Sequence, residues 1–258
     1  MRAPTNYWKD FWNEQARRSG SDYALNRQTT VRVEKLEQHA LAQFLQSVSP
    51  QAQDVVLDAG CGSGRNISIL SPLVKEVVAV DYSEQMIQRA QERVSAEHLP
   101  NVRLATADVT QLQYPSGSFD KVVCASVLQY LDRKNCAQAL GEMVRVCKPG
   151  GRLVLHIKNG CSLYGLSLTV LRPVARLLGK RMKPEFYRSR GWHERTLARF
   201  GGEVLDRDGF GILTFVPLPQ GCVGHLLNWE LRFPVPKLLK KFAVNCQVTI
   251  LVKPLRPA

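Results

Sequence analysis

The chain has 258 residues, which is enough for one domain with a sizeable core but too few for two comfortable domains. Hydrophobic residues make up 45% and charged residues 22% of the sequence, values typical of a globular protein that folds in water. The first residues lack the apolar core of a secretory signal, and the longest mostly apolar stretch, 163–171, is too short to span a membrane. We therefore expect a cytoplasmic protein.

The formal net charge is +13, and much of the excess lies in residues 172–199, which hold nine basic side chains against Glu185 and Glu194. Such a stretch is compatible with nucleic acid, an anionic membrane surface, an acidic substrate or simply a solvated face. The seven cysteines are scattered singly and are not paired with histidines at ligand spacing. We expect reduced thiols, no disulfide framework and no metal site.

The N-terminal region is predicted to be helical. Residues 7–18 place Tyr7, Trp8, Phe11 and Trp12 at helical intervals, so a short helix with an aromatic face is expected. A second helix is predicted over about 33–47, before Pro50.

From residue 54 the pattern changes to short apolar runs that alternate with amphipathic segments. Several runs are continuously apolar, as expected of parallel strands that are buried on both faces. The intervening helices are predicted near 64–73, 83–97 and 133–147. This order predicts right-handed crossovers and a doubly wound α/β sheet. The five predicted strands are 55–59, 77–81, 102–108, 119–126 and 151–158.

The C-terminal part is less regular. A leucine-rich, basic and mostly helical stretch covers 163–182, a short helix is predicted over 192–200, and a strand begins at 203–206. Four prolines indicate that 211–245 is an insertion with broken helices. Residues 246–253 are rich in β-branched side chains and predict a final strand.

The segment VVLDAGCGSGRN, residues 55–66, joins a predicted strand to a predicted helix through glycines. Its G-x-G-x-G spacing differs from the nicotinamide fingerprint, and Asp58 would repel a pyrophosphate. A carboxylate here suits a ligand with a positive charge, such as the ammonium of an amino acid. Asp81 ends the next strand, where it can accept the hydrogen bonds of a ribose diol. Asp108 ends the third strand, where it can receive an adenine amino group.

At these residues the sequence resembles the class I S-adenosylmethionine-dependent methyltransferases, in particular the small-molecule and ubiquinone/menaquinone-biosynthesis group. Four blocks carry the resemblance in order and at the family's spacing: VLDAGCGSG (56–64), VVAVDYSEQMI (77–87), ATADVTQLQYPSGSFDKVVCASVLQYL (105–131) and KPGGRLVL (148–155). The resemblance is strong over 50–158 and weaker over 191–206. It implies a Rossmann-like, seven-stranded sheet whose last strand, here 246–253, is antiparallel.

The resemblance also implies S-adenosylmethionine as cofactor and a set of contacts. Asp58, Gly60 and Gly62 would line its methionine part, and Asp81 its ribose. The adenine ring would lie between Tyr82 and Met86 on its face and Asp108 and Val109 at its edge, while Ala125 and Ser126 would lie near the transferable methyl group. In many relatives an N-terminal helix closes over the cofactor, a role open to 7–18 here, as is simple packing.

The catalytic candidates are His193 and Tyr130. A general base helps when the acceptor is a hydroxyl or a protonated amine. His193 lies beside Trp192 and Glu194, although its position begins a helix in the family pattern. Tyr130 stands in VLQYL, where many relatives carry a histidine, so a mechanism that uses that histidine does not transfer. His156, His225 and Tyr187 are further candidates.

The domain layout that follows is a single methyltransferase domain over 1–258. It comprises N-terminal helices or a lid (1–49), a cofactor-binding core (50–158), substrate-cap insertions (159–190 and 211–245) and the final strand (246–253). The apolar and aromatic residues of the insertions predict a moderately large apolar or aromatic small-molecule acceptor with an O, N or C nucleophile. The sequence leaves the oligomeric state open.

Several alternatives stay open at this point. The stretch 163–182 could lie on an anionic membrane and serve a lipid-like substrate, although a cap over a hydrophobic substrate is favoured. RNA as acceptor is not expected, because no RNA-binding module or N-P-P-Y-type tetrapeptide is found. A nicotinamide-dependent oxidoreductase is disfavoured by Asp58 and the glycine spacing. A non-catalytic S-adenosylmethionine-binding protein is disfavoured by the intact set of Asp58, Asp81 and Asp108.

Overall fold

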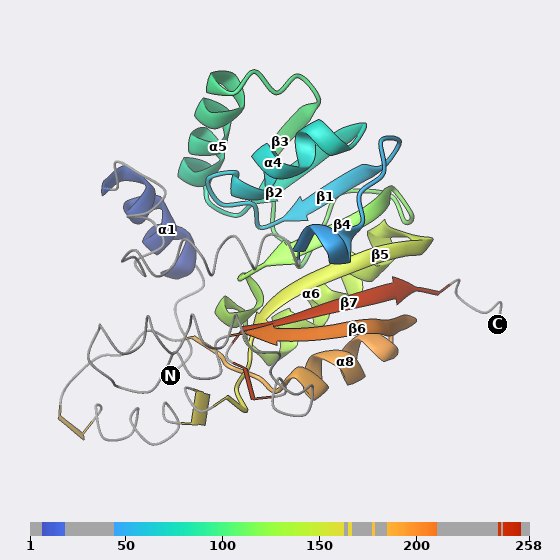
Figure 1. Cartoon of the computed structure of the whole chain (residues 1–258). Helices are drawn as coiled ribbons and strands as arrows, with labels where there is room; N and C mark the ends of the chain where they lie inside the picture. The colour runs from blue at the N-terminus through green and yellow to red at the C-terminus, as the bar shows by residue number, and fades with distance from the viewer. Residues whose placement is uncertain are drawn as a thin grey trace, which may run out of the picture.

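Seven strands form a single sheet in the order β3-β2-β1-β4-β5-β7-β6 (Figure 1). The computed structural model describes residues 7–18, 44–162, 165–166, 177–178, 185–210, 242–243 and 245–253. Strands β1 to β5 pair in parallel, whereas β7 runs antiparallel to both β5 and β6. The predicted sheet with an antiparallel last strand is confirmed. The strands are β1 (Val55–Ala59), β2 (Glu76–Asp81), β3 (Val102–Thr106), β4 (Phe119–Ala125), β5 (Cys147–Lys158), β6 (Gly202–Phe210) and β7 (Asn245–Val252).

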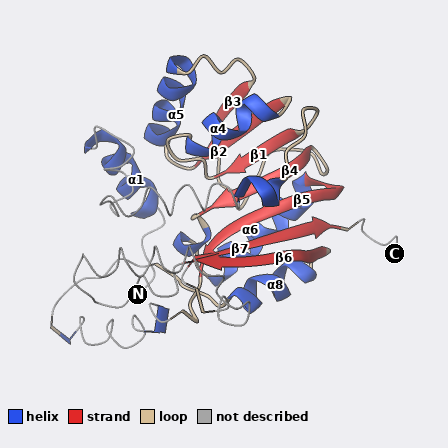
Figure 2. Cartoon of the chain, viewed as in Figure 1, coloured by secondary structure: helices blue, strands red, loops and turns tan. Residues whose placement is uncertain are grey.

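Helices cover both faces of the sheet (Figure 2). The apolar side chains of α4 (Arg65–Leu70) and α5 (Glu84–Ala96) share one buried cluster with Phe44 and Val48 of the helical turn 44–48. Those of α6 (Arg133–Val146) and α8 (Arg190–Ala198) share the other with β4, β5 and β7. Central strands therefore bury both faces, as their continuously apolar sequences predict. α1 (Tyr7–Arg18) packs against α5.

Local signals account for the helix boundaries. Ser83 caps α5 by accepting a hydrogen bond from the Met86 amide, and Asp132 caps α6 in the same way through Asn135. The predicted helix 64–73 is split, because Pro72 lies in the short 3-10 helix η1 (Ser71–Leu73) that follows α4.

Several strands and helices begin or end at residues other than those predicted. β3 stops at Thr106 instead of continuing to Asp108, and β5 begins at Cys147 instead of at the predicted residue 151. Of the helix predicted over 33–47, only the turn at 44–48 falls within the described residues and is helical. The predicted helix 163–182 and insertion 211–245 lie almost wholly outside the described residues. The four-part domain layout stays a prediction.

None of the described helices has both the length and the apolar composition that crossing a bilayer requires. The six cysteines in the described part of the chain are unbridged, and all except Cys161 are buried.

Candidate functional site

The predicted cofactor residues lie along the edge of the sheet where the parallel strands β1 to β4 end. β1 is flanked by β2 on one side and β4 on the other, so the chain order reverses between β1 and β4. In open α/β sheets, ligands bind in the crevice at such a switch point, outside the carboxyl ends of the strands. The fold thus brings Asp58, Asp81 and Ala125, which are far apart in sequence, to one edge of the sheet.

The glycine loop after β1 is fixed by backbone hydrogen bonds to β2. The amides of Gly60 and Cys61 donate to the Val80 carbonyl at 2.8 and 2.9 Å, and the Gly62 amide donates to Asp81 Oδ2 at 2.9 Å. Gly60 and Gly62 have φ values of 87° and 56°, a region that favours glycine. A Cβ on Gly60 would lie 2.2 Å from Val127 Cγ2, whereas a Cβ on Gly62 would meet no atom of the described residues within 4 Å. The loop packs tightly at Gly60 and opens at Gly62.

Asp58 lies beneath this loop and is completely buried. Its Oδ1 accepts a long hydrogen bond from Asn66 Nδ2 at 3.4 Å, and its Oδ2 has no hydrogen-bond partner among the described residues. Burial raises the pKa of this carboxyl to about 7, against the Asn66 hydrogen bond, and the charge of Asp81 adds to the rise. A buried carboxylate without a partner is costly, so a cationic group placed here would be stabilised.

Asp81 at the end of β2 has both carboxylate oxygens turned to backbone amides. Oδ1 accepts from the Ser83 amide at 2.8 Å while Oδ2 accepts from Gly62. Burial nevertheless raises its pKa. Each oxygen keeps a second lone pair, which a pair of hydroxyl groups can use. Next to it, Tyr82 is exposed and Met86 is buried at the first turn of α5.

The third and fourth strands complete this edge. Asp108 is exposed just beyond β3, and its Oδ1 accepts from both the amide and the hydroxyl of Thr110 at 2.8 Å, while Val109 is buried. Ala125 ends β4. Ser126 has a φ of 60°, and its amide donates to the His156 carbonyl of β5 at 3.0 Å. Such a strained non-glycine residue often marks a functional site.

Helix α1 packs across the start of α5 and the 3-10 helix η2 (Leu128–Tyr130) that follows β4. The rings of Trp8 and Trp12 lie 4.4 and 5.6 Å from the Tyr130 ring, between centroids. Ser83 Oγ donates to Asn13 Oδ1 at 2.7 Å, and Arg89 Nε donates to the Ala16 carbonyl at 2.7 Å. The aromatic face of α1 thus meets the segment after β4, at the carboxyl side of the sheet (Figure 1).

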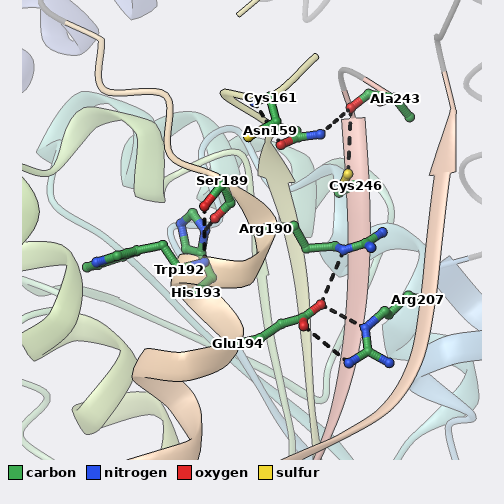
Figure 3. A network of polar contacts seen from close by, with 10 residues as sticks. All are labelled: Asn159, Cys161, Ser189, Arg190, Trp192, His193, Glu194, Arg207, Ala243 and Cys246. Carbon is green, nitrogen blue, oxygen red and sulfur yellow. Dashed lines mark hydrogen bonds and ion pairs between the residues drawn. The ribbon is translucent and has the colours of Figure 1, made fainter. Parts of the chain in front are cut away.

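The two catalytic candidates lie in different surroundings. Tyr130 is close to the cofactor edge, and its pKa is raised to about 12, first by burial and then by the charge of Glu185. His193 is buried on α8, where its Nδ1 lies 3.1 Å from the Ser189 carbonyl and its ring lies edge-on to Trp192 (Figure 3). Burial lowers the pKa of His193 to about 4, so the imidazole is neutral at pH 7.

The residues near His193 make polar contacts of their own. Glu194 points away from it and pairs with Arg190 at 3.2 Å and with Arg207 at 2.8 Å (Figure 3). Nearby, the Asn159 side chain donates to the Ala243 carbonyl at 3.0 Å and accepts from the Cys161 amide at 3.1 Å. The Glu194–Arg207 pair joins α8 to β6, and Asn159 joins the end of β5 to Ala243, which precedes β7. The assignment of a base role to His193 or Tyr130 stays a prediction.

Some residues of this region were not singled out by the sequence analysis. Asn66 contacts Asp58, and Val127 contacts the Gly60 backbone region, yet neither has a motif of its own. Glu185 lies in a basic stretch with no regular pattern, so the sequence offers no sign of its position.

A model of the methyltransferase domain family matches residues 56–151. The demethylmenaquinone methyltransferase of Geobacillus kaustophilus is 31% identical over 185 residues, which cover 67% of this chain and 78% of that relative. The chain belongs to the class I S-adenosylmethionine-dependent methyltransferases. The family predicted from the four sequence blocks is thereby confirmed.

Other methyltransferases are similar to this chain in sequence or in fold. The phosphatidylethanolamine N-methyltransferase of Cereibacter sphaeroides is 29% identical over 170 residues, or 62% of this chain and 77% of that one. The crystal structure of magnesium protoporphyrin IX methyltransferase from Synechocystis PCC 6803, with bound SAH, superposes with a TM-score of 0.67 at 18% identity, over 97% of this chain and 100% of that chain. The chain spans about half the length of several other curated relatives that it matches.

Proposed function

We propose that this protein is an S-adenosylmethionine-dependent methyltransferase that modifies an O, N or C nucleophile of a moderately large apolar or aromatic small molecule. The observation that carries the proposal is the arrangement of Asp58, Gly62 and Asp81 at the carboxyl edge of the sheet. It combines a buried carboxylate oxygen that has no partner among the described residues with an open glycine position and a second carboxylate. These features fit a ligand with both an ammonium group and a ribose.

In this proposal each predicted residue contacts one part of S-adenosylmethionine. Asp58, Gly60 and Gly62 hold the methionine part, since a cation beside Asp58 offsets the cost of its buried charge. Asp81 accepts hydrogen bonds from the ribose hydroxyls. Adenine lies against Tyr82 and Met86, with Asp108 and Val109 at its edge, and Ala125 and Ser126 lie near the methyl group. When bound, S-adenosylmethionine supplies a methyl group that the sulfonium already activates.

The protein's own part is to position an acceptor and to exclude water. Helix α1 supports this role, because its Trp8 and Trp12 rings lie on Tyr130 at the cofactor edge. Tyr130, neutral at pH 7 with a pKa near 12, is suited to donate or accept a hydrogen bond to the acceptor. His193, neutral and buried, would serve as a base only if the acceptor reached α8.

The names of relatives support a small-molecule acceptor of this kind. The Geobacillus kaustophilus relative is named for demethylmenaquinone and the Synechocystis PCC 6803 structure for a magnesium porphyrin, both of which are large molecules with flat rings. The rings of Trp8 and Trp12, which meet the Tyr130 ring at 48° and 71°, offer aromatic contacts for such an acceptor. We expect the protein to act in the cytoplasm.

A second candidate is a lipid-like acceptor at a membrane surface. It is favoured by the phosphatidylethanolamine N-methyltransferase relative and by Leu166, Leu177 and Leu178, whose exposed fractions are 53%, 87% and 69%. Exposed apolar side chains in a basic stretch are typical of peripheral membrane contact. Flotation with anionic vesicles at low salt tests this candidate, and absence of binding contradicts it.

The proposed function is tested in two steps. Calorimetry with S-adenosylhomocysteine first measures binding to the wild-type protein and to Asp81→Ala, with Glu203→Gln on β6 as a matched loss of a carboxylate far from the crevice. Formation of S-adenosylhomocysteine from S-adenosylmethionine is then followed with a short-chain demethylmenaquinol, with phosphatidylethanolamine vesicles and with total RNA. Failure of the wild-type protein to bind S-adenosylhomocysteine would overturn the proposal.

A further inference from the structure

The indole N–H of Trp8 is a buried hydrogen-bond donor that has no acceptor in the part of the chain that the structure describes. The side chain as a whole is only half-buried, so the nitrogen is on its inward side. A donor that has lost water without gaining another acceptor is unfavourable, and such an atom in a native structure needs an explanation. A bound ligand with an oxygen at this point would supply the missing acceptor.

Helix α1 carries Trp8 to the carboxyl edge of the sheet and is attached on two sides (Figure 1). On one side, Lys9 Nζ lies 2.9 Å from Glu84 Oε1 and 5.4 Å from the centre of the Tyr82 ring, at the start of α5. On the other side, the Trp8 ring lies 4.4 Å from the Tyr130 ring of η2, between centroids. Since α5 follows β2 and η2 follows β4, α1 joins the segments that follow the two neighbours of β1.

A short series of contacts leads from Trp8 to the glycine loop. The Tyr130 amide donates to the Val127 carbonyl at 3.0 Å. Val127 in turn packs on Gly60, where a Cβ would lie 2.2 Å from Val127 Cγ2. Gly60 follows Asp58 by two residues, at the end of β1. The buried donor of Trp8 and the buried Oδ2 of Asp58 therefore belong to one continuous group of contacts.

The glycine loop itself has few donors to offer a ligand. The amides of residues 60–62 already donate to the Val80 carbonyl and to Asp81. The charges of Asp58 and Asp81 also repel any anionic group that approaches the end of β1 or β2. An anionic part of the ligand must therefore find its hydrogen-bond donor on another element, away from these two carboxylates.

We propose that Trp8 Nε1 donates a hydrogen bond to the carboxylate of the amino-acid part of S-adenosylmethionine. The inference rests on the proposed function. An amino-acid end has an ammonium and a carboxylate on the same carbon atom, and the two buried atoms without partners among the described residues, Asp58 Oδ2 and Trp8 Nε1, match these two groups. Hydrogen bonds to an ionised group are stronger than those between neutral groups. Helix α1 thereby distinguishes the complete cofactor from nucleosides that lack the carboxylate.

Calorimetry of the full-length protein with two ligands tests this contact. The ligands are S-adenosylhomocysteine and its decarboxylated analogue, which keeps the sulfur, ribose, adenine and ammonium. Trp8→Phe keeps an aromatic ring but removes the N–H. It should weaken binding of S-adenosylhomocysteine about tenfold or more, the usual effect of losing a hydrogen bond to a charged group. The affinity for the analogue should change less than about twofold, because it has no carboxylate to lose the contact.

A second carboxylate-free ligand and a direct signal support the comparison. Methylthioadenosine lacks both the ammonium and the carboxylate, so Trp8→Phe should leave its affinity unchanged as well. The indole proton resonance of Trp8, identified by its loss in Trp8→Phe, should move downfield when S-adenosylhomocysteine binds. It should not do so with either carboxylate-free ligand.

The controls separate this contact from the packing of α1. Trp12→Phe removes an indole N–H from the same helix, and its ring also contacts Tyr130, so this variant should bind both calorimetry ligands as wild type does. Equal weakening of both ligands in Trp8→Phe would show only a looser α1, and the inference would be wrong. Arg65, the first residue of α4 after the glycine loop, is the charged alternative. A carboxylate-specific loss in Arg65→Gln but not in Trp8→Phe would also overturn the inference.

Failure of this inference and failure of the proposed function give different results. If the wild-type protein binds S-adenosylhomocysteine but Trp8→Phe binds it equally well, the inference is wrong and the proposed function stands. If the wild-type protein does not bind S-adenosylhomocysteine, the proposed function fails first.

Discussion

The two halves of the proposed site are built in different ways. The cofactor half uses residues 58–62 and 81–83, which two paired strands bring together, and most of its contacts involve the backbone. The proposed acceptor half has Tyr130 of η2 beside the segment 185–188, and long-range hydrogen bonds between these two segments set their positions. A short sequence motif therefore specifies the first half, whereas only the complete fold defines the second.

The strongest test of the backbone-built half compares its two glycines. Gly60→Ala should destabilise the protein by about 3 kcal/mol or more, because the new Cβ adds a clash with Val127 to the cost of a positive φ. Gly62→Ala has the φ cost alone, about 1 kcal/mol, since its Cβ enters open space. Chemical denaturation measures both values. Equal losses would show that Val127 moves aside freely.

The next test concerns the carboxylate at the end of β2. Asp81→Ala should weaken S-adenosylhomocysteine binding by about 1–3 kcal/mol through loss of the ribose hydrogen bonds. The variant also removes the acceptor for the Gly62 and Ser83 amides, so Asp81→Asn, which keeps a carbonyl oxygen, serves as the milder comparison. Calorimetry gives both affinities, and unchanged affinity in Asp81→Ala would break the assignment.

A pH series distinguishes the buried carboxylate of the cofactor half from the rest of the site. The Asp58 pKa is about 7, so the group is charged above this pH and protonated below it. A ligand with an ammonium group needs the charged form, so affinity should be full above pH 7 and fall about tenfold per unit below it. Asp58→Asn should flatten this profile. The Asp58 carboxyl titrates over roughly pH 5.5 to 8. A wild-type affinity that stays constant over this range would contradict a contact between Asp58 and the ammonium group of the ligand.

The same shift affects folding without ligand. Because folding raises this carboxyl pKa from its usual value near 4, the folded state binds more protons than the unfolded state between about pH 4 and 7. Stability of the ligand-free protein therefore decreases as pH rises through that range. Thermal unfolding of wild type against Asp58→Asn isolates the contribution of this one group.

The smallest expected effect tests how α1 is attached. Asn13→Ala removes the acceptor for the Ser83 hydroxyl, which also caps α5, and should cost about 1 kcal/mol of stability. If α1 covers the cofactor, as the proposal requires, S-adenosylhomocysteine should also dissociate faster from this variant. Stopped-flow fluorescence of Trp8 and Trp12 follows dissociation, and an unchanged rate would indicate that α1 only packs against α5.

Much of the fold was predictable because its signals are local. The apolar runs 55–57 and 122–125 marked two of the buried parallel strands, and the Ser83 cap marked the start of α5. The ends were harder. β5 extends back to Cys147 because Cys147 pairs with Phe119 across a register shift, a pairing that depends on a partner 28 positions away. Likewise β3 ends before Asp108, which was predicted to end that strand. The Asp108 side chain instead accepts a hydrogen bond from the Thr110 amide in the turn that follows.

The site divides along the same line. Asp58, Asp81 and the glycines were predicted as a group because strand ends and glycine spacing fix them locally, and the pairing of β1 with β2 brings them to one edge of the sheet. The packing of the segment 185–188 against η2 was not predicted, since it depends on a hydrogen bond between Phe186 and Gln129 that no local pattern encodes. His193 was predicted as a candidate base because it lies between Trp192 and Glu194 in sequence, yet these two side chains point to different sides of α8 (Figure 3).

The solitary Oδ2 of Asp58 has a consequence for the lifetime of the protein in the cell. A buried carboxylate without a partner among the described residues lowers the stability of the ligand-free form. A ligand that binds only the folded state raises the stability again, with the logarithm of its concentration once the ligand is in excess. Marginally stable forms are removed faster by quality-control proteases. Under the proposed function, the amount of this protein would therefore follow the supply of methyl donor, with no separate regulator.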